Sequence, residues 1–132
     1  MKYRENIKNK DQLSILGFGC MRFVKDDKET EKQIIYAIKN GVNYFDTAYT
    51  YTNSEKVLGK VLKKGYREKV KIATKIPHFL IKKNSDLDKI FYEQLNRLQT
   101  CYIDYNLMHV LTDVAIWQRL VDLGILKWLA EK

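Results

Sequence analysis

The chain has 132 residues with a single proline; 45% of its residues are hydrophobic, 30% are charged, and the formal net charge is +8. This length suits one domain, so we predict a single domain over residues 1–132. The composition excludes a disordered chain, and no apolar run reaches the roughly 18 residues that a membrane helix requires. The lysines are spread along the chain rather than gathered with aromatic residues on one face, so we predict no nucleic-acid binding and no membrane binding.

The segment before Leu13 is polar and predicts a β-hairpin around the turn "NKDQ", residues 9–12. It contains no apolar h-region, so we predict no secretory signal. The two cysteines, Cys20 and Cys101, form no CxxC pair. Together these features predict a cytoplasmic protein with neither a disulfide framework nor a metal site.

Strand patterns alternate with helix patterns along the rest of the chain. Apolar runs predict strands over "LSILGFGCMRF", "VNYFD", "KVKIATKI" and "YIDYNLMHV", which are residues 13–23, 42–46, 69–76 and 102–110. We expect the first of these to be a buried strand that two glycines interrupt. Helical periodicity predicts helices over residues 28–41, 52–65, 84–99 and 112–132, the last with a break near Gly124.

Residues at the helix ends predict where the helices begin and stop. Thr52 and Glu55 have the spacing of a capping box, in which each side chain bonds the backbone of the other. Ser85 is the expected N-cap of the third helix. Gly41 and Gly65 stand where the first two helices should stop, because glycine readily adopts the left-handed conformation that ends a helix.

The order of the elements predicts an α/β fold. Strands that alternate with helices at this spacing form βαβ units around a parallel sheet. Near-continuous apolar strands such as "KIATKI" fit a sheet that helices cover. The residues alone leave two architectures open: a small doubly wound sheet and part of a (β/α)8 barrel.

Three ionisable residues stand at or near the ends of successive predicted strands. Asp46 ends the second strand, Lys75 follows it by 29 residues, and His109 follows Lys75 by 34 residues. Each interval is about one βα unit, and the carboxyl ends of parallel strands share one edge, where ligands bind. We therefore expect these side chains to converge, with Tyr51 on a loop at the same edge.

An acid, a phenol, an amine and an imidazole can together protonate a carbonyl oxygen. A free tyrosine has a pKa of about 10, which makes it a poor proton donor at neutral pH. A neighbouring lysine cation favours the phenolate and lowers that pKa, a carboxylate holds the lysine in place, and a histidine can donate to a substrate oxygen. This set predicts nicotinamide-dependent carbonyl reduction with a tyrosine as general acid.

Each of these residues also has a plainer explanation when it is taken alone. A strand-end aspartate such as Asp46 is often a helix cap, and Tyr51 is one of nine tyrosines. His109 could simply satisfy a hydrogen bond near the core. The joint pattern, in register with the βα period, is what favours a functional site over these separate explanations.

The sequence resembles the aldo/keto reductase superfamily over essentially its whole length. The resemblance rests on "LSILGFGCMRF", on "AIKNGVNYFDTAYTY" followed by "SEKVLGKVL", on "KVKIATKI" and on "YIDYNLMHV". It is strongest to the bacterial branch whose full-length members end in a ferredoxin-like iron–sulfur segment, and this chain lacks the cysteines of such a segment. The resemblance implies a (β/α)8 barrel whose N-terminal half, four βα units preceded by a β-hairpin, is represented here.

The resemblance also implies a cofactor and residue roles. The cofactor would be NADPH, or less often NADH, and the substrate a small carbonyl compound. Tyr51 would be the general acid, with Lys75 and Asp46 tuning it and His109 orienting the carbonyl. The turn of Gly19, Cys20, Met21 and Arg22, together with Asp46, would approach the nicotinamide end of the cofactor; Cys20 would line the site as a small residue, and the hairpin would plug the barrel bottom.

The departure from the family pattern lies in the length of the chain. A complete barrel takes about 250 residues, and the family's pyrophosphate and adenine sites lie on later strands than those present here. We therefore expect a truncated aldo/keto reductase whose isolated chain lacks turnover. The alternative is a non-catalytic half-barrel module that binds a protein partner or associates with itself through its open barrel edges.

Overall fold

A parallel four-stranded sheet forms the centre of the fold, in a computed structural model that describes residues 1–132. Its strands lie in the order β3-β4-β5-β6 and all neighbours are parallel. Their bounds are Phe18–Gly19, Tyr44–Asp46, Lys71–Pro77 and Tyr105–His109. Because β3 pairs only with β4, and β6 only with β5, both edges of this sheet are open.

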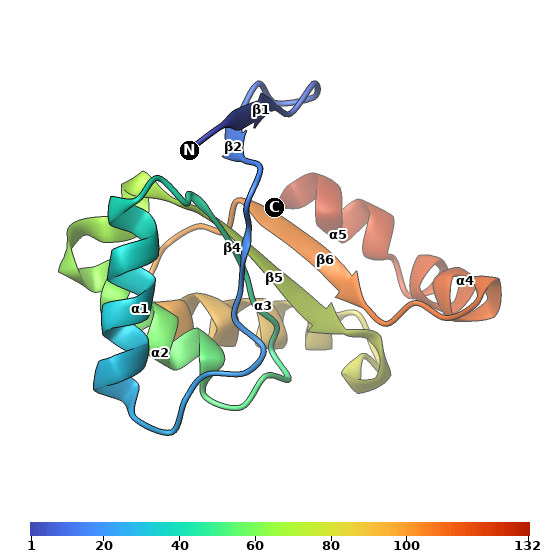
Figure 1. Cartoon of the computed structure of the whole chain (residues 1–132). Helices are drawn as coiled ribbons and strands as arrows, with labels where there is room; N and C mark the ends of the chain where they lie inside the picture. Colours follow the sequence, from blue (N-terminus) through green and yellow to red (C-terminus); the bar gives the residue numbers. More distant parts are fainter.

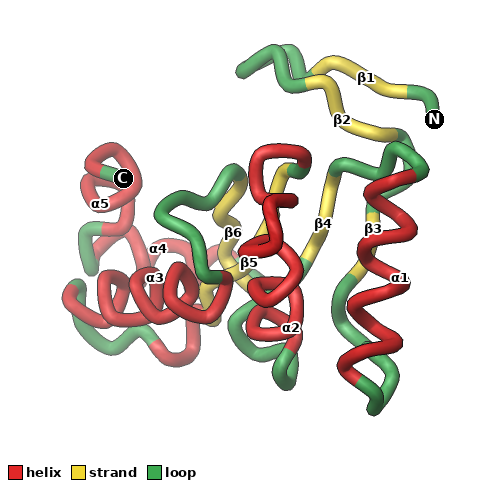
Figure 2. The backbone as a smooth tube through the Cα atoms, turned by 90° about the vertical axis from the view of Figure 1, so that its left-hand side faces the viewer, coloured by secondary structure: helices red, strands yellow, loops and turns green.

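Helices cover one face of the sheet. They are α1 (Asp27–Lys39), α2 (Ser54–Val61), α3 (Ser85–Leu98), α4 (Val114–Asp122) and α5 (Ile125–Glu131). Short turns lie between them: a turn at Leu62–Tyr66, in which Lys64 and Gly65 leave the helical conformation, and 3-10 turns at Arg67–Lys69 and His78–Leu80. Figure 2 shows α1, α2 and α3 following one another in that order, from right to left, on one side of the strands. None of the helices combines the length and the apolar character that crossing a bilayer requires.

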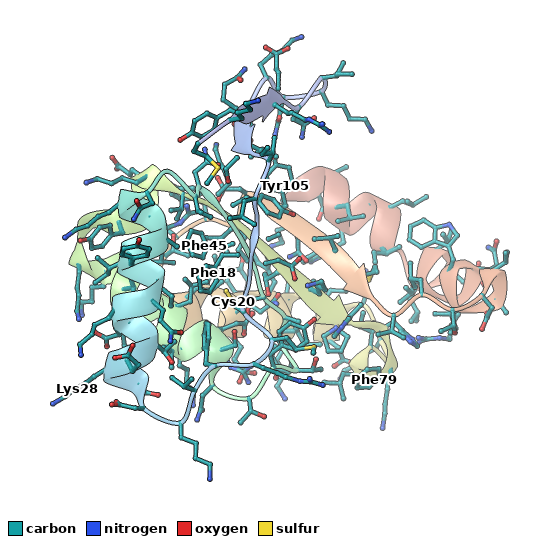
Figure 3. The ribbon with its side chains drawn as sticks, in the orientation of Figure 1. Phe18, Cys20, Lys28, Phe45, Phe79 and Tyr105 are labelled. Atoms are coloured by element: carbon teal, nitrogen blue, oxygen red, sulfur yellow. The ribbon has the colours of Figure 1, made fainter.

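Two apolar clusters fill the space between the sheet and the helices. The first lies under α1 and α2, where the Phe18 and Phe45 rings stack with their centres 5.2 Å apart beside Cys20 (Figure 3). The second lies under α3, α4 and α5 and consists of Ile76, Ile81, Leu87, Ile90, Leu120, Ile125 and Trp128. Apolar residues of the predicted helices therefore form much of the core of the protein.

A hairpin of β1 (Tyr3–Glu5) and β2 (Gln12–Ser14) lies across the amino ends of the central strands (Figure 1). Asp11 lies between the two strands of the hairpin. Its carboxylate pairs with the Lys71 ammonium at 2.8 Å and accepts a hydrogen bond of 2.7 Å from the Tyr105 phenol. The predicted hairpin is thus confirmed, and it covers the end of the sheet where a plug of the barrel bottom was expected.

The strands divide their side chains between two faces. In β5 the side chains of Ile72 and Ile76 are completely buried in the clusters under the helices, whereas Lys71 and Lys75 are only partly buried. This alternation follows from the two-residue period of a strand. It leaves a second face that carries polar groups and that no helix covers.

Three details of the predicted elements are corrected by the structure. The first strand is much shorter than residues 13–23, because only Phe18 and Gly19 pair with β4, and Leu16 and Met21 are exposed rather than buried. The capping box is wrong, since α2 begins at Ser54 after Asn53 in a left-handed conformation.

The predicted N-cap of the third helix is also wrong. Ser85 is already inside α3, and the cap residue is Asn84, whose side chain makes no capping bond. The predicted helix stops are confirmed by backbone geometry: Gly41 and Gly65 both have φ of +89°, and Gly124, with φ of +87°, separates α4 from α5.

Candidate active site

Asp46 and Lys75 form an ion pair on the uncovered face of the sheet. Asp46 ends β4, and Lys75 lies near the end of β5, on the neighbouring strand. The Lys75 Nζ donates to Asp46 Oδ1 at 2.5 Å and to the backbone oxygen of Thr47 at 2.8 Å. The side chains remain 16% and 36% exposed for Lys75 and Asp46, so the pair is held in place yet accessible to a ligand.

Tyr51 lies on the turn that follows β4, close to this ion pair. Its backbone N–H donates to the oxygen of Ala48 at 3.0 Å, which closes the turn. The centre of its ring is 5.2 Å from the Lys75 Nζ, within reach of a cation–π interaction. The carboxylate, the ammonium and the phenol therefore lie next to one another, as the spacing of the sequence predicted.

His109 ends β6 and completes the group. Its ring meets the Tyr51 ring edge to face, with 5.7 Å between the ring centres and an angle of 82°. Burial and then the nearby Lys75 cation lower the pKa of His109, which favours the neutral imidazole at pH 7. Its Nδ1 lies 3.2 Å from the hydroxyl of Thr50; when that hydroxyl donates, the ring proton is on Nε2 and is available to a ligand.

The predicted cofactor turn follows β3, next to Asp46. Gly19 is in register with Asp46, and no atom lies within 4 Å of the place where a Cβ of Gly19 would stand. Met21 is 51% exposed, and Arg22 is exposed as well. This part of the face is open, so a planar ring could lie against the Gly19 backbone beside Asp46.

Cys20 does not line this face, contrary to the expectation from the sequence. Its side chain is completely buried in the first cluster, and its N–H donates to the oxygen of Asp46 at 2.8 Å. Burial and the nearby Asp46 carboxylate raise the pKa of the thiol to about 12, which keeps it protonated and unreactive at neutral pH. Only the backbone of Cys20 can contribute to a site here.

The four ionisable side chains face an open surface rather than a closed cavity. A pocket of about 160 Å³ includes Tyr51, Glu55 and Arg97 in its lining, but not Asp46, Lys75 or His109. Nowhere do three His, Cys, Asp or Glu side chains gather closely enough to hold a metal ion. The arrangement therefore offers a proton donor, a cation and a hydrogen-bond donor around one accessible spot, which suits a ligand with a polarised oxygen.

Two groups near the site were not predicted from the sequence. Thr50, the partner of His109, could have been noticed because it directly precedes Tyr51 and carries a hydroxyl. Glu55 was taken for a capping residue, yet it is 1% exposed and accepts hydrogen bonds from Thr74 and Gln94. No local pattern reveals these partners, because they come from β5 and α3.

Comparison with known proteins agrees with this geometry. The model of the aldo/keto reductase family matches residues 15–115, which are most of the chain and include all four residues of the group. The parallel βα units, with the acid, phenol, amine and imidazole near the carboxyl ends of the strands, define an α/β protein of the barrel class. The chain belongs to the aldo/keto reductase family.

Curated relatives support the assignment. The chain is 34% identical to a probable aldo-keto reductase 1 of Glycine max, over 92% of this chain and 39% of the relative. It is 33% identical to a 4-dihydromethyl-trisporate dehydrogenase of Mucor mucedo, over 75% of this chain and 32% of the relative. The chain thus spans 32% to 39% of the length of these relatives.

Solved structures give the same result for the fold. A thermostable aldo-keto reductase solved with the inhibitor epalrestat superposes with a TM-score of 0.75 at 26% identity, covering 94% of this chain and 51% of that structure. The holo form of an aldo-keto reductase from Bacillus halodurans gives a TM-score of 0.71 at 32% identity, covering 81% and 40%. The predicted partial barrel with its N-terminal hairpin is therefore confirmed.

Proposed function

We propose that this chain carries the catalytic residues of an NAD(P)H-dependent oxidoreductase that reduces an aldehyde or a ketone to an alcohol. One observation carries the proposal: the Lys75–Asp46 ion pair lies beside Tyr51 and His109 on one uncovered face. The names of the relatives, which describe reductases and a dehydrogenase, support the reaction class. Membership of the family supports a small carbonyl compound as the substrate class.

Each side chain of the group has a part in the proposed reaction. Tyr51 donates its phenolic proton to the carbonyl oxygen as that oxygen gains negative charge. The Lys75 ammonium, 5.2 Å from the ring centre, stabilises the phenolate that results, and Asp46 holds Lys75 in place. His109, neutral at pH 7, donates a hydrogen bond that orients the carbonyl oxygen.

The open surface over Gly19 and beside Asp46 could accommodate the nicotinamide end of a cofactor. NADPH or NADH, when bound, supplies the hydride that reduces the carbonyl carbon. Gly19, Met21, Arg22 and the backbone of Cys20 would border that group, with Asp46 on its other side. The role of these residues is to hold the ring close to the proton donor and away from water.

The test compares the chain with its Tyr51→Phe variant in NADPH oxidation driven by an aldehyde. The assay is made on the chain itself and on a fusion that continues it with the C-terminal part of the Glycine max relative. In the fusion we expect Tyr51→Phe to lower turnover by about 100-fold or more, the contribution of a general acid, while NADPH affinity stays unchanged. Equal turnover of the fusion with Tyr51 and the fusion with Tyr51→Phe would contradict the assignment of Tyr51.

The second candidate function is a half-barrel module that associates with itself or with a protein partner. The observation in its favour is the pair of open strand edges at β3 and β6. Near β6, Leu107 is 41% and Val110 55% exposed, which suits an interface. Analytical ultracentrifugation distinguishes the two functions: a defined oligomer that fails to bind NADPH would favour the module over the reductase.

A further inference from the structure

Glu55 is a buried carboxylate that the proposed reaction does not use. It lies in the first turn of α2, four residues after Tyr51, and its side chain is 2% exposed. Taking a carboxylate out of water is costly unless every oxygen is paired. The contacts of Glu55 therefore show what this charge holds together.

One oxygen of Glu55 is bonded to strand β5 directly behind Lys75. Glu55 Oε1 accepts from the Thr74 hydroxyl at 2.6 Å and from the Gln94 amide nitrogen at 3.0 Å. That nitrogen also lies 3.2 Å from the backbone oxygen of Lys75, an oxygen that accepts from the Tyr49 N–H at 3.2 Å. Thr74 and Gln94 are completely buried, so water does not compete for these bonds.

The other oxygen of Glu55 is connected to the turn that carries Tyr51. Glu55 Oε2 lies 3.3 Å from the Arg97 guanidinium, and the same Arg97 nitrogen donates to the backbone oxygen of Tyr49 at 2.9 Å. The guanidinium carbon is 4.0 Å from the centre of the Tyr49 ring. The turn is thereby fixed from both sides, by its N–H on Lys75 and by its carbonyl on Arg97.

Packing of the helices does not require this charge. Helices α2 and α3 already approach closely at Gly59, where an added Cβ would lie 2.3 Å from the backbone oxygen of Arg97. The apolar side chains of Val57, Leu58 and Val61 hold α2 against the sheet. The bonds of Glu55 are directed instead at the backbone around Lys75 and Tyr49.

We propose that Glu55, acting through Gln94 and Arg97, is a positioning residue that fixes the Tyr51 turn relative to Lys75. It touches no reacting atom in the proposed reaction. Its charge keeps Arg97 on the Tyr49 carbonyl, and its pairing with Gln94 keeps β5 in register with the turn. The consequence for catalysis rests on the proposed function, since it matters only if Tyr51 protonates a substrate.

The test measures the geometry of the turn in the folded chain by NMR, with ring-labelled tyrosine and histidine. The Tyr51 signal is assigned by its loss in Tyr51→Phe, and its contact with the His109 ring is followed in Glu55→Gln. We expect Glu55→Gln to remove that contact and to speed amide exchange at Tyr49 about tenfold, while the Tyr105 ring signal stays in place.

Glu93→Gln is the matched control. Glu93 also pairs with Arg97, at 2.6 Å, and accepts from the Tyr49 phenol at 2.7 Å, but its side chain is 39% exposed and it makes no bond to Thr74 or Gln94. We expect the Tyr51–His109 contact to survive in this variant. An unchanged contact in Glu55→Gln, or an equal loss in both variants, would overturn the proposal.

Arg97→Lys keeps the test decisive if Glu55→Gln fails to fold. The ammonium of a lysine ends one bond short of the Arg97 nitrogen that contacts both Glu55 and the Tyr49 carbonyl, so we expect the same loss of contact. Unfolding of both variants would overturn the proposal, because the network would then be a requirement of the fold. The readout needs neither cofactor nor turnover, so failure of the reductase proposal remains a separate result.

Discussion

The two ends of the central sheet use charged residues in different ways. At the amino ends, the hairpin covers the strands, and Asp104, with a side chain 8% exposed, pairs with Arg67 at 2.7 Å and accepts from the N–H of Ile72. At the carboxyl ends no element lies over the charges, and Asp46 and Lys75 keep part of their surface exposed. Similar ion pairs therefore stand in a closed region and in an open one.

The difference indicates that charges at the amino ends of the strands stabilise the fold, whereas charges at the carboxyl ends serve a functional site. A buried and fully bonded charge stabilises only the arrangement it belongs to, and losing its partner is costly. An accessible pair contributes little stability but can respond to a ligand. We expect substitutions at the amino ends to act on unfolding, and those at the carboxyl ends to act on function.

The largest expected contrast is between Asp104→Ala and Asp46→Ala. The first leaves Arg67 with three other hydrogen bonds but removes its buried carboxylate partner and the acceptor of the Ile72 N–H, and we expect it to lower the free energy of unfolding by about 3 kcal/mol. The second leaves Lys75 bonded to the Thr47 oxygen and should cost less than about 1 kcal/mol. Urea unfolding of the two variants measures both values, and equal losses would remove the distinction between the two ends.

Two tyrosine substitutions, one at each end of the sheet, test the same comparison with a smaller expected change in the free energy of unfolding. The Tyr105 phenol donates to Asp11 and accepts from Asn6 and Asn9, so Tyr105→Phe should cost about 1.5 kcal/mol of unfolding free energy. The Tyr51 phenol makes no hydrogen bond within the chain, so Tyr51→Phe should change stability by less than about 0.5 kcal/mol. Thermal or urea unfolding checks the pair; a large loss in Tyr51→Phe would mean that this phenol has a structural role.

The smallest expected effect is the pH dependence that His109 confers. Because its pKa is lowered in the folded state, the unfolded chain takes up the proton first as the pH falls. The contribution of His109 is therefore complete above its ordinary pKa of about 6.5 and is lost as the pH falls through the lowered value. Stability measured between neutral and mildly acidic pH should decline less steeply in His109→Gln, and identical slopes would contradict the shift.

The sequence predicted most of the fold because its signals are local and repeated. The helical periodicity over residues 52–65 and the glycine stop at Gly65 depend on neighbouring residues, and both agree with the structure. The predicted capping residues of α2 and α3 were wrong, and for α2 the structure gives a physical reason. Ser54, rather than Thr52, begins α2. Its hydroxyl donates to the backbone oxygen of Cys20, 34 residues earlier, and is also bonded to the hydroxyl of Thr47. The sequence around Ser54 does not reveal these two contacts.

In the candidate site, too, some features follow from patterns in the sequence and others depend on contacts between distant residues. Convergence of Asp46, Lys75 and His109 follows from the βα period, which the sequence displays directly. The orientation of Cys20 follows from strand alternation after Gly19, but the register with β4 was needed to see it. The partners of Glu55 lie 19 and 39 residues away, on β5 and α3, and no spacing rule within a helix points to them.

The most direct test of the reductase proposal is a titration of the isotope-labelled chain with NADPH, followed by amide NMR signals. The proposal predicts saturable shifts at Gly19, Met21, Asp46 and Tyr51, with the hairpin signals around Asp11 unmoved. Saturable shifts confined to the carboxyl ends would mean that the open face of the sheet is a cofactor site. No shift at millimolar cofactor, or shifts centred on the hairpin, would contradict the proposal.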